Sequence, residues 1–63
     1  MPVIEVKMLA GRSPEKKSEL AERLTAVTAE VLDIKGDGID VIIQDVPRDS
    51  WARGGVVFSN RGR

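Results

Sequence analysis

The first twelve residues decide the fold of this chain: Met1-Pro2-Val3-Ile4-Glu5-Val6-Lys7-Met8-Leu9-Ala10-Gly11-Arg12. Apolar residues alternate from Pro2 to Leu9, so that Ile4, Val6 and Met8 share one apolar face. A period of two with β-branched residues predicts a β-strand. A proline suits the start of a strand, because its missing N–H is least costly there.

A helix follows this strand after a short break. Ser13 is a good N-cap, and Pro14 at the first helical position has the right φ and no donor to leave unpaired. The helix is predicted from Pro14 to about Asp33. Its apolar stripe recurs at spacings of four, three and four and comprises Leu20, Leu24, Val27 and Val31. Three further residues widen this face, namely Ala21, Thr28 and Leu32.

The rest of the helix is charged and is predicted to be a solvated face. The residues of this face are Lys16, Lys17, Glu19, Glu22, Arg23 and Glu30. Glu19 and Arg23 stand four residues apart in the favoured order, which predicts an ion pair along the helix surface.

A second strand is predicted from Ile39 to Val46, after a reversal in which Gly36 and Gly38 would supply positive φ angles. The strand is nearly continuous in β-branched residues, as expected where both faces are buried. Asp40 interrupts it and needs either solvent or a partner. A helix between two strands predicts a parallel pair with a right-handed crossover.

The last third of the chain predicts a small hairpin. A turn-rich segment, 47–50, leads to Trp51, and Gly54-Gly55 then precedes a short strand from Val56 to Phe58. A polar tail follows, 59–63. The fold class is therefore α+β, with a β-α-β subunit and a short C-terminal hairpin in a single domain, 1–63.

Composition limits the function classes. A chain of 63 residues has a marginal core, and small proteins usually add disulfides, a metal or a partner chain. The chain has no Cys and no His, so neither a disulfide nor a zinc site is expected, and no cofactor is predicted. Oligomerisation remains, because two strands and one helix leave the second sheet face uncovered.

Charge and hydropathy exclude further classes. Ten basic and ten acidic residues cancel, which disfavours a nucleic-acid-binding β-α module. No apolar run is long enough to span a bilayer and no signal peptide is recognisable, so a cytoplasmic protein without membrane partners is expected.

Pro2 carries the strongest chemical hint. If Met1 is removed, the ring nitrogen of Pro2 becomes a secondary amine, and few other groups of this chain titrate near neutral pH. An apolar pocket and a neighbouring cation such as Arg12 would lower the pKa of that amine toward neutrality, where a general base works best. The plainer interpretation is that Pro2 only begins an edge strand.

The residues together resemble the 4-oxalocrotonate tautomerase family. The resemblance rests on Met1-Pro2-Val3-Ile4, on Leu9-Ala10-Gly11-Arg12-Ser13 before the helix, on 39–44 as second strand, and on Trp51 with Gly54-Gly55 in a terminal hairpin. It covers essentially the whole chain. It implies two subunits pairing into a four-stranded sheet, and three such dimers forming a homohexamer.

The same resemblance implies site roles. Pro2 would be the general base or acid that moves a proton in a small anionic enol or unsaturated keto acid. Arg12 would interact with a substrate carboxylate, often in a neighbouring subunit's site. Trp51 would wall the pocket, where the family usually has Phe. Each also has a plain interpretation: Arg12 as a surface residue, and Trp51 as an oligomer contact.

Asp40 departs from the family pattern, because well-studied members carry a second arginine at this position. An anion there would repel a dicarboxylate and, near Pro2, would raise the pKa of the amine. Arg53 is a candidate for the missing cation. Asp40 itself is open to three interpretations: it activates water in a hydratase-type reaction, pairs with a neighbour's arginine, or marks a non-catalytic partner subunit of a hetero-oligomer.

Overall fold

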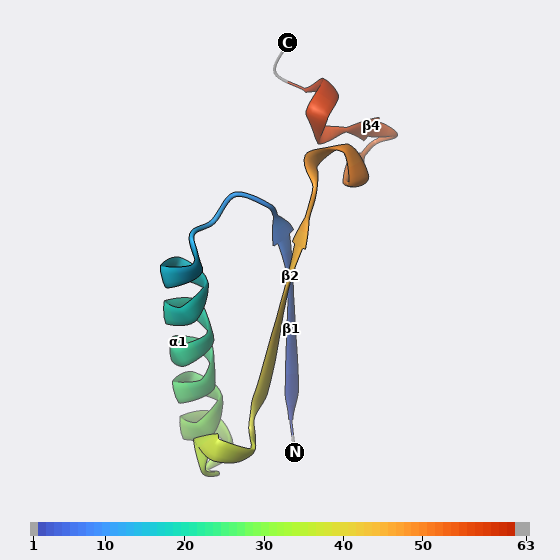
Figure 1. Ribbon diagram of the computed structural model, residues 1–63. Helices are drawn as coiled ribbons and strands as arrows, with labels where there is room; N and C mark the ends of the chain where they lie inside the picture. The colour runs from blue at the N-terminus through green and yellow to red at the C-terminus, as the bar shows by residue number, and fades with distance from the viewer. Residues whose placement is uncertain (1, 62–63) are drawn as a thin grey trace.

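The computed structural model describes residues 2–61 and contains a β-α-β unit followed by a small hairpin (Figure 1). The unit consists of β1 (Val3–Leu9), α1 (Pro14–Leu32) and β2 (Asp40–Val46). Beyond the carboxyl ends of the strands lie β3 (Ala52–Arg53) and β4 (Val56–Val57). Single 3₁₀ turns occupy 36–38, 48–50 and 58–60. The predicted α+β class is confirmed, whereas Met1 lies outside the described residues.

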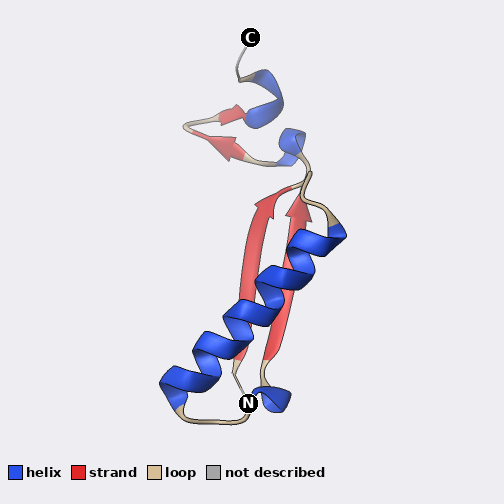
Figure 2. Ribbon diagram, turned by 90° about the vertical axis from the view of Figure 1, so that its left-hand side faces the viewer, coloured by secondary structure: helices blue, strands red, loops and turns tan. Residues whose placement is uncertain are grey.

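The sheet has the predicted parallel topology. β1 pairs with β2 from Val3 opposite Asp40 to Leu9 opposite Val46. Figure 2 shows α1 running along one face of the two strands. The residues turned toward this side, Ile4, Val6, Met8, Val41 and Ile43, are half-buried, as the period-two pattern predicts.

The helix begins and ends close to the predicted residues, but the residue with positive φ at its end differs from the prediction. Ser13 Oγ accepts a hydrogen bond from the Lys16 backbone N–H at 3.2 Å, and Pro14 is the first helical residue. The left-handed residue at the other end is Asp33, with φ 54°, a conformation that Asp tolerates better than most residues, and its backbone N–H donates to the carbonyls of Ala29 and Glu30. The predicted positive φ at Gly36 and Gly38 is wrong: these residues form a 3₁₀ turn instead.

The apolar stripe predicted for α1 is only partly covered. Leu20 and Leu24 are half-buried, but Val27 is 57% exposed and Val31 73% exposed. The covered face includes Leu24 together with Ala21 and Thr28, which were predicted to widen the stripe, and also Lys17, which was predicted to be solvated. The covered part is therefore the widened side of the predicted face.

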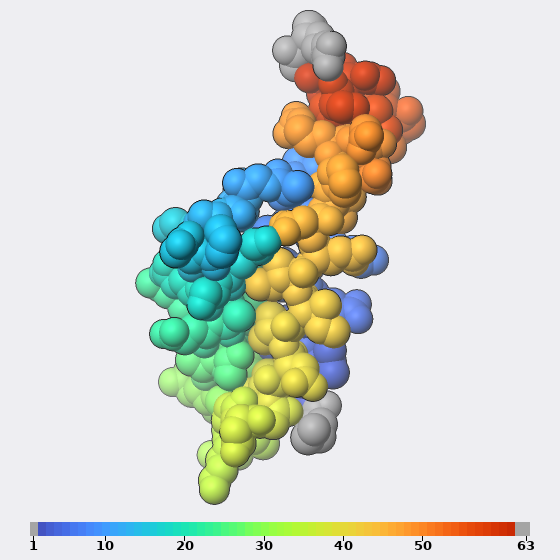
Figure 3. Space-filling model, in the orientation of Figure 1, coloured from blue at the N-terminus to red at the C-terminus, as the bar shows by residue number. Residues whose placement is uncertain are grey.

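β2 is covered on one face only within one chain, as expected where a single helix leaves the second sheet face for another subunit. Ile42 points away from α1 and is 53% exposed. Among the described residues only Ile39 is buried. The accessible surface is 4955 Å², against about 4,000 Å² for a typical monomer of this mass. The narrow body in Figure 3 therefore leaves apolar surface that further copies or partners would cover.

Candidate functional site

Pro2 and Asp40 lie together at the amino end of the two strands. The Asp40 backbone N–H donates a hydrogen bond to the Pro2 carbonyl oxygen at 3.1 Å, and Asp40 is the register partner of Val3. Pro2 is half-buried and Asp40 is exposed. Sequence reasoning left open whether Asp40 stands near Pro2, and the structure makes them immediate neighbours.

Arg12 lies at the opposite, carboxyl end of β1. Its loop turns at Gly11, whose φ of 130° favours glycine, and the Ala10 backbone N–H donates to the Val46 carbonyl at 2.9 Å. That bond holds the start of the Arg12 loop beside the start of the hairpin segment. Arg12 is exposed and has no ion-pair partner among residues 2–61.

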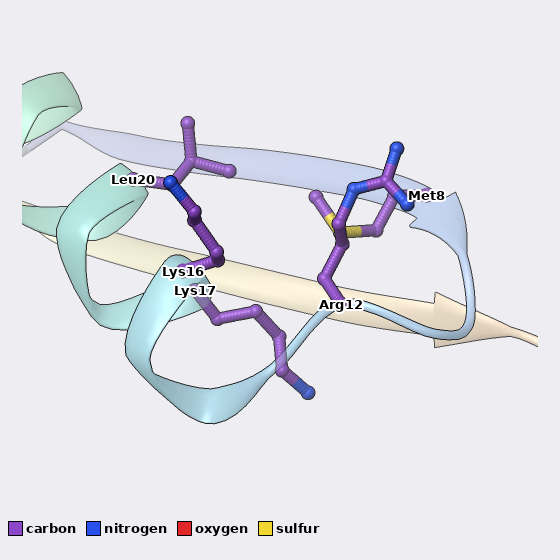
Figure 4. Close-up of a pocket in the computed structure, with 5 residues that line it drawn as sticks. All are labelled: Met8, Arg12, Lys16, Lys17 and Leu20. Atoms are coloured by element: carbon purple, nitrogen blue, oxygen red, sulfur yellow. The ribbon is translucent and has the colours of Figure 1, made fainter.

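Arg12 also borders a shallow groove of about 210 Å³ between β1 and the first turns of α1. The groove is lined by Met8, Arg12, Lys16, Lys17 and Leu20. Figure 4 shows the Arg12 guanidinium beside Met8 and the Lys16 side chain beside Leu20, whereas the Lys17 ammonium points to the other side. The groove thus combines an apolar floor with cationic rims, a surface suited to a small organic anion.

Lys17 does not lie on a solvated helix face, contrary to prediction. Its Nζ lies 2.6 Å from Asp45 Oδ2 and its side chain is 29% exposed. The ion pair joins the first turn of α1 to β2. The predicted pair on the helix surface is confirmed, with Arg23 Nη2 2.7 Å from Glu19 Oε2.

The hairpin carries an aromatic and arginine cluster. Strands β3 and β4 pair in antiparallel register, and Gly54 and Gly55 both have positive φ, 61° and 84°, as a two-residue turn of type I′ requires. The Trp51 and Phe58 rings lie 6.0 Å apart between centroids. The Arg53 guanidinium lies over Phe58, 5.1 Å from the ring centroid.

The five candidate residues thus fall into two groups. Pro2 and Asp40 occupy the amino end of the strands, whereas Arg12, Trp51 and Arg53 occupy the carboxyl end (Figure 1). Seven residues of extended chain separate these ends by about 20 Å. A small acid therefore cannot contact Pro2 and Arg12 of the same chain at once. Within residues 2–61 no three His, Cys, Asp or Glu side chains gather as a metal site.

Comparison with known proteins decides the family. The model of the tautomerase enzyme family matches residues 2–61, which include every candidate residue above. This chain belongs to the tautomerase family. The 2-hydroxymuconate tautomerase of Comamonas testosteroni is 35% identical to this tautomerase over 63 residues, the whole of both chains.

Similar solved structures support the same family assignment. A crystal structure of a 4-oxalocrotonate tautomerase homologue has a TM-score of 0.91 and 44% identity, and the match covers both chains completely. A heterohexameric 4-oxalocrotonate tautomerase from Chloroflexus aurantiacus J-10-fl has a TM-score of 0.90 and 38% identity, covering 97% of this chain and 98% of that one. The resemblance inferred from the sequence is confirmed, and with it the isomerase class of the enzyme.

Two residues of the hairpin cluster escaped sequence reasoning. Arg61 was assigned to a polar tail, yet its guanidinium lies 5.2 Å from the Phe58 ring centroid. Phe58 was expected to continue β4 but begins a 3₁₀ turn, and its carbonyl accepts a hydrogen bond from Arg48 Nη2 at 3.3 Å. The sequence feature that could have indicated this cluster is that Arg53 and Arg61 flank Phe58 near the end of the chain.

No helix within residues 2–61 is both long and apolar enough to cross a bilayer.

Proposed function

We propose that this tautomerase moves a proton in a small enol or unsaturated keto acid without a cofactor, using the Pro2 amine, after removal of Met1, as general base and acid. The nitrogen lone pair would take the enol hydroxyl proton while the carbonyl forms and the double bond shifts. The same proton would then be returned to a carbon of the acid, so the overall composition is unchanged. The observation that carries the proposal is the position of Pro2 at the open amino end of β1.

The site would be formed between two copies of the chain. If two β-α-β units pair antiparallel into a four-stranded sheet, the amino end of one β1 lies beside the carboxyl end of the other. Pro2 of one copy would then meet Arg12 and Trp51 of its neighbour. The uncovered sheet face and the exposed Val27 and Val31 support a larger assembly, and a homohexamer of three such dimers is proposed.

Each residue would then have a physical role. The Arg12 guanidinium would bind a substrate carboxylate through charge-assisted hydrogen bonds. The Trp51 ring would exclude water from one wall of the site, and Arg53 would supply a second cation from the hairpin. Desolvation and nearby cations would lower the pKa of the Pro2 amine, whereas the neighbouring Asp40 carboxylate would raise it.

A Pro2→Ala variant tests the proposal. The protein is first verified by mass to lack Met1, and ketonisation of phenylenolpyruvate and of 2-hydroxymuconate is followed by absorbance. Loss of the secondary amine should lower kcat about 10²–10⁴-fold, the usual contribution of a general base. Pro14→Ala is the matched control, because it changes a proline at the start of α1 and should retain activity. Full activity of Pro2→Ala would refute the proposed base.

A second candidate function rests on Asp40. The Asp40 carboxylate beside Pro2 opposes the binding of an anionic substrate there. The chain would then be a non-catalytic subunit that contributes Arg12 and a contact surface to a related catalytic subunit. The heterohexameric relative supports this alternative. Expression of the chain alone separates the two candidates. A stable, active homo-oligomer supports the enzyme, whereas aggregation that is relieved by a second short tautomerase chain supports the partner subunit.

A further inference from the structure

Two arginines share one aromatic ring at the end of the chain. The Arg53 and Arg61 guanidinium carbons lie 5.1 and 5.2 Å from the Phe58 ring centroid. Arg61 Nη2 also donates a hydrogen bond to the Arg53 backbone carbonyl at 2.5 Å. Phe58 therefore positions both cations, because a ring face attracts a guanidinium and restricts the directions in which it extends.

The cluster has little negative charge of its own. Between residues 48 and 61 the chain carries Arg48, Arg53 and Arg61 but only one acid, Asp49. Asp49 accepts a hydrogen bond from Ser50 at 3.4 Å, and no ion pair joins it to any of these arginines among the described residues. Two cations held near one ring repel each other, and a bound anion would offset that repulsion.

The ligand class follows from the shape of these groups. A guanidinium presents parallel N–H groups that match the two oxygens of a carboxylate. Trp51 lies beside Phe58 with its ring tilted by 31°, so an apolar surface borders the cations. We propose that Arg53 and Arg61, positioned by Phe58, form a carboxylate-binding pair that takes one carboxylate of a dicarboxylic substrate.

This inference rests on the proposed function, because the hairpin must lie near Pro2 of another copy. The hairpin and Asp40 would have opposite effects on the second carboxylate of the substrate. The Asp40 carboxylate would repel it, whereas Arg53 and Arg61 would attract it. The acid would therefore bind with one carboxylate at Arg12 and the other directed to the hairpin, away from Asp40.

Fluorescence of Trp51, the single tryptophan of the chain, measures anion binding without catalysis. Succinate is the dicarboxylate probe and butyrate the monocarboxylate probe, in protein lacking Met1 and carrying Pro2→Ala. We expect succinate to bind more tightly than butyrate. Arg53→Gln, Arg61→Gln and Phe58→Leu should each raise the succinate Kd about tenfold. Phe58→Tyr keeps the ring face and should retain tight binding, and Arg23→Gln is the control for loss of one exposed cation.

Kinetics with Pro2 intact give the second readout. In the Phe58→Leu and Arg61→Gln variants the KM for 2-hydroxymuconate should rise about tenfold with little change in kcat, because a contact made equally in ground and transition states is lost. Turnover of phenylenolpyruvate, which has one carboxylate, should change less than twofold.

The proposed base, Pro2, and the proposed carboxylate-binding pair, Arg53 and Arg61, can be refuted independently of each other. Unchanged succinate binding and unchanged KM in Arg61→Gln and Phe58→Leu would overturn the carboxylate pair, whatever Pro2→Ala does to turnover. Full activity of Pro2→Ala, together with weakened succinate binding in the arginine variants, would refute the proposed base and retain the carboxylate pair.

Discussion

At the scale of single residues, the Asp40 carboxylate opposes the chemistry proposed for Pro2. The backbone N–H of Asp40 is bonded to the Pro2 carbonyl, which keeps the two residues adjacent. A nearby anion favours the charged ammonium form of an amine. Asp40→Asn should therefore lower the pKa of the Pro2 amine.

The measurement is an NMR titration of the Pro2 nitrogen in protein lacking Met1. The acid limb of the kcat/KM profile, which reports the free amine, should move to lower pH by the same amount. Glu22→Gln removes one exposed carboxylate from the middle of α1 and serves as the control. A pKa that stays constant or rises in Asp40→Asn would show that Asp40 does not act on the amine.

At the scale of elements, the turn between β3 and β4 depends on two glycines with positive φ. A Cβ added at Gly54 or Gly55 would meet no atom within 4 Å, so the cost of alanine there is conformational alone. Gly55→Ala should destabilise the hairpin by about 1 kcal/mol. Thermal unfolding at fixed chain concentration measures the loss.

D-Alanine at position 55 is the matched control, since a chain of 63 residues is accessible to chemical synthesis. The D-residue places the same methyl group on a backbone that prefers positive φ, so its stability should equal or exceed that of the glycine protein. Equal destabilisation by both alanines would contradict the conformational explanation. If only L-alanine destabilises the hairpin, the L-alanine variant should also bind succinate more weakly, because Arg53 directly precedes the turn.

The elements themselves were predictable from the sequence because their signals are local. Alternation predicted β1, Ser13 and Pro14 predicted the start of α1, and Gly54-Gly55 predicted the hairpin. The exposure of Val27 and Val31 and the Lys17–Asp45 ion pair were not predictable, since they depend on which part of the apolar face meets the sheet. At the helix end the residue with positive φ is Asp33 and not one of the two glycines, since Asp is among the few residues besides Gly that adopt this conformation.

The candidate site was predictable only as a set of residues. Family resemblance supplied Pro2, Arg12 and Trp51, but the structure places Pro2 at one end of a strand and the other two at the opposite end. In the proposed site their meeting would depend on contacts between copies, which leave no periodic pattern in a single sequence. The aromatic and arginine cluster of the hairpin was not predicted, because Arg53 and Phe58 come together only after the chain reverses at the hairpin.

At the scale of the whole molecule, one chain is more extended than a compact domain of its length. Its radius of gyration is 14.9 Å, against about 11 Å for a compact domain of 63 residues. The body measures 46 × 24 × 14 Å, which is little more than one helix on two strands. Folding and assembly are therefore expected to be one process, with stability that depends on chain concentration.

Ile42→Glu tests this coupling. Ile42 is 53% exposed in the single chain, so a carboxylate there disturbs no contact of the subunit's own core. In an assembly that covers the outer sheet face, the same carboxylate would be buried without a partner, which is strongly unfavourable. We expect Ile42→Glu to abolish the oligomer in sedimentation equilibrium and to lose the circular dichroism of folded chain at micromolar concentration.

Ser18→Glu adds the same charge on the exposed side of α1 and should leave the mass of the assembly unchanged. A folded, monomeric Ile42→Glu protein would show that one chain is stable without its partners. An oligomer of unchanged mass would show that the outer sheet face stays open to solvent. The composite site would then require a different pairing of chains, because an open outer face removes one of the two surfaces that support the proposed hexamer.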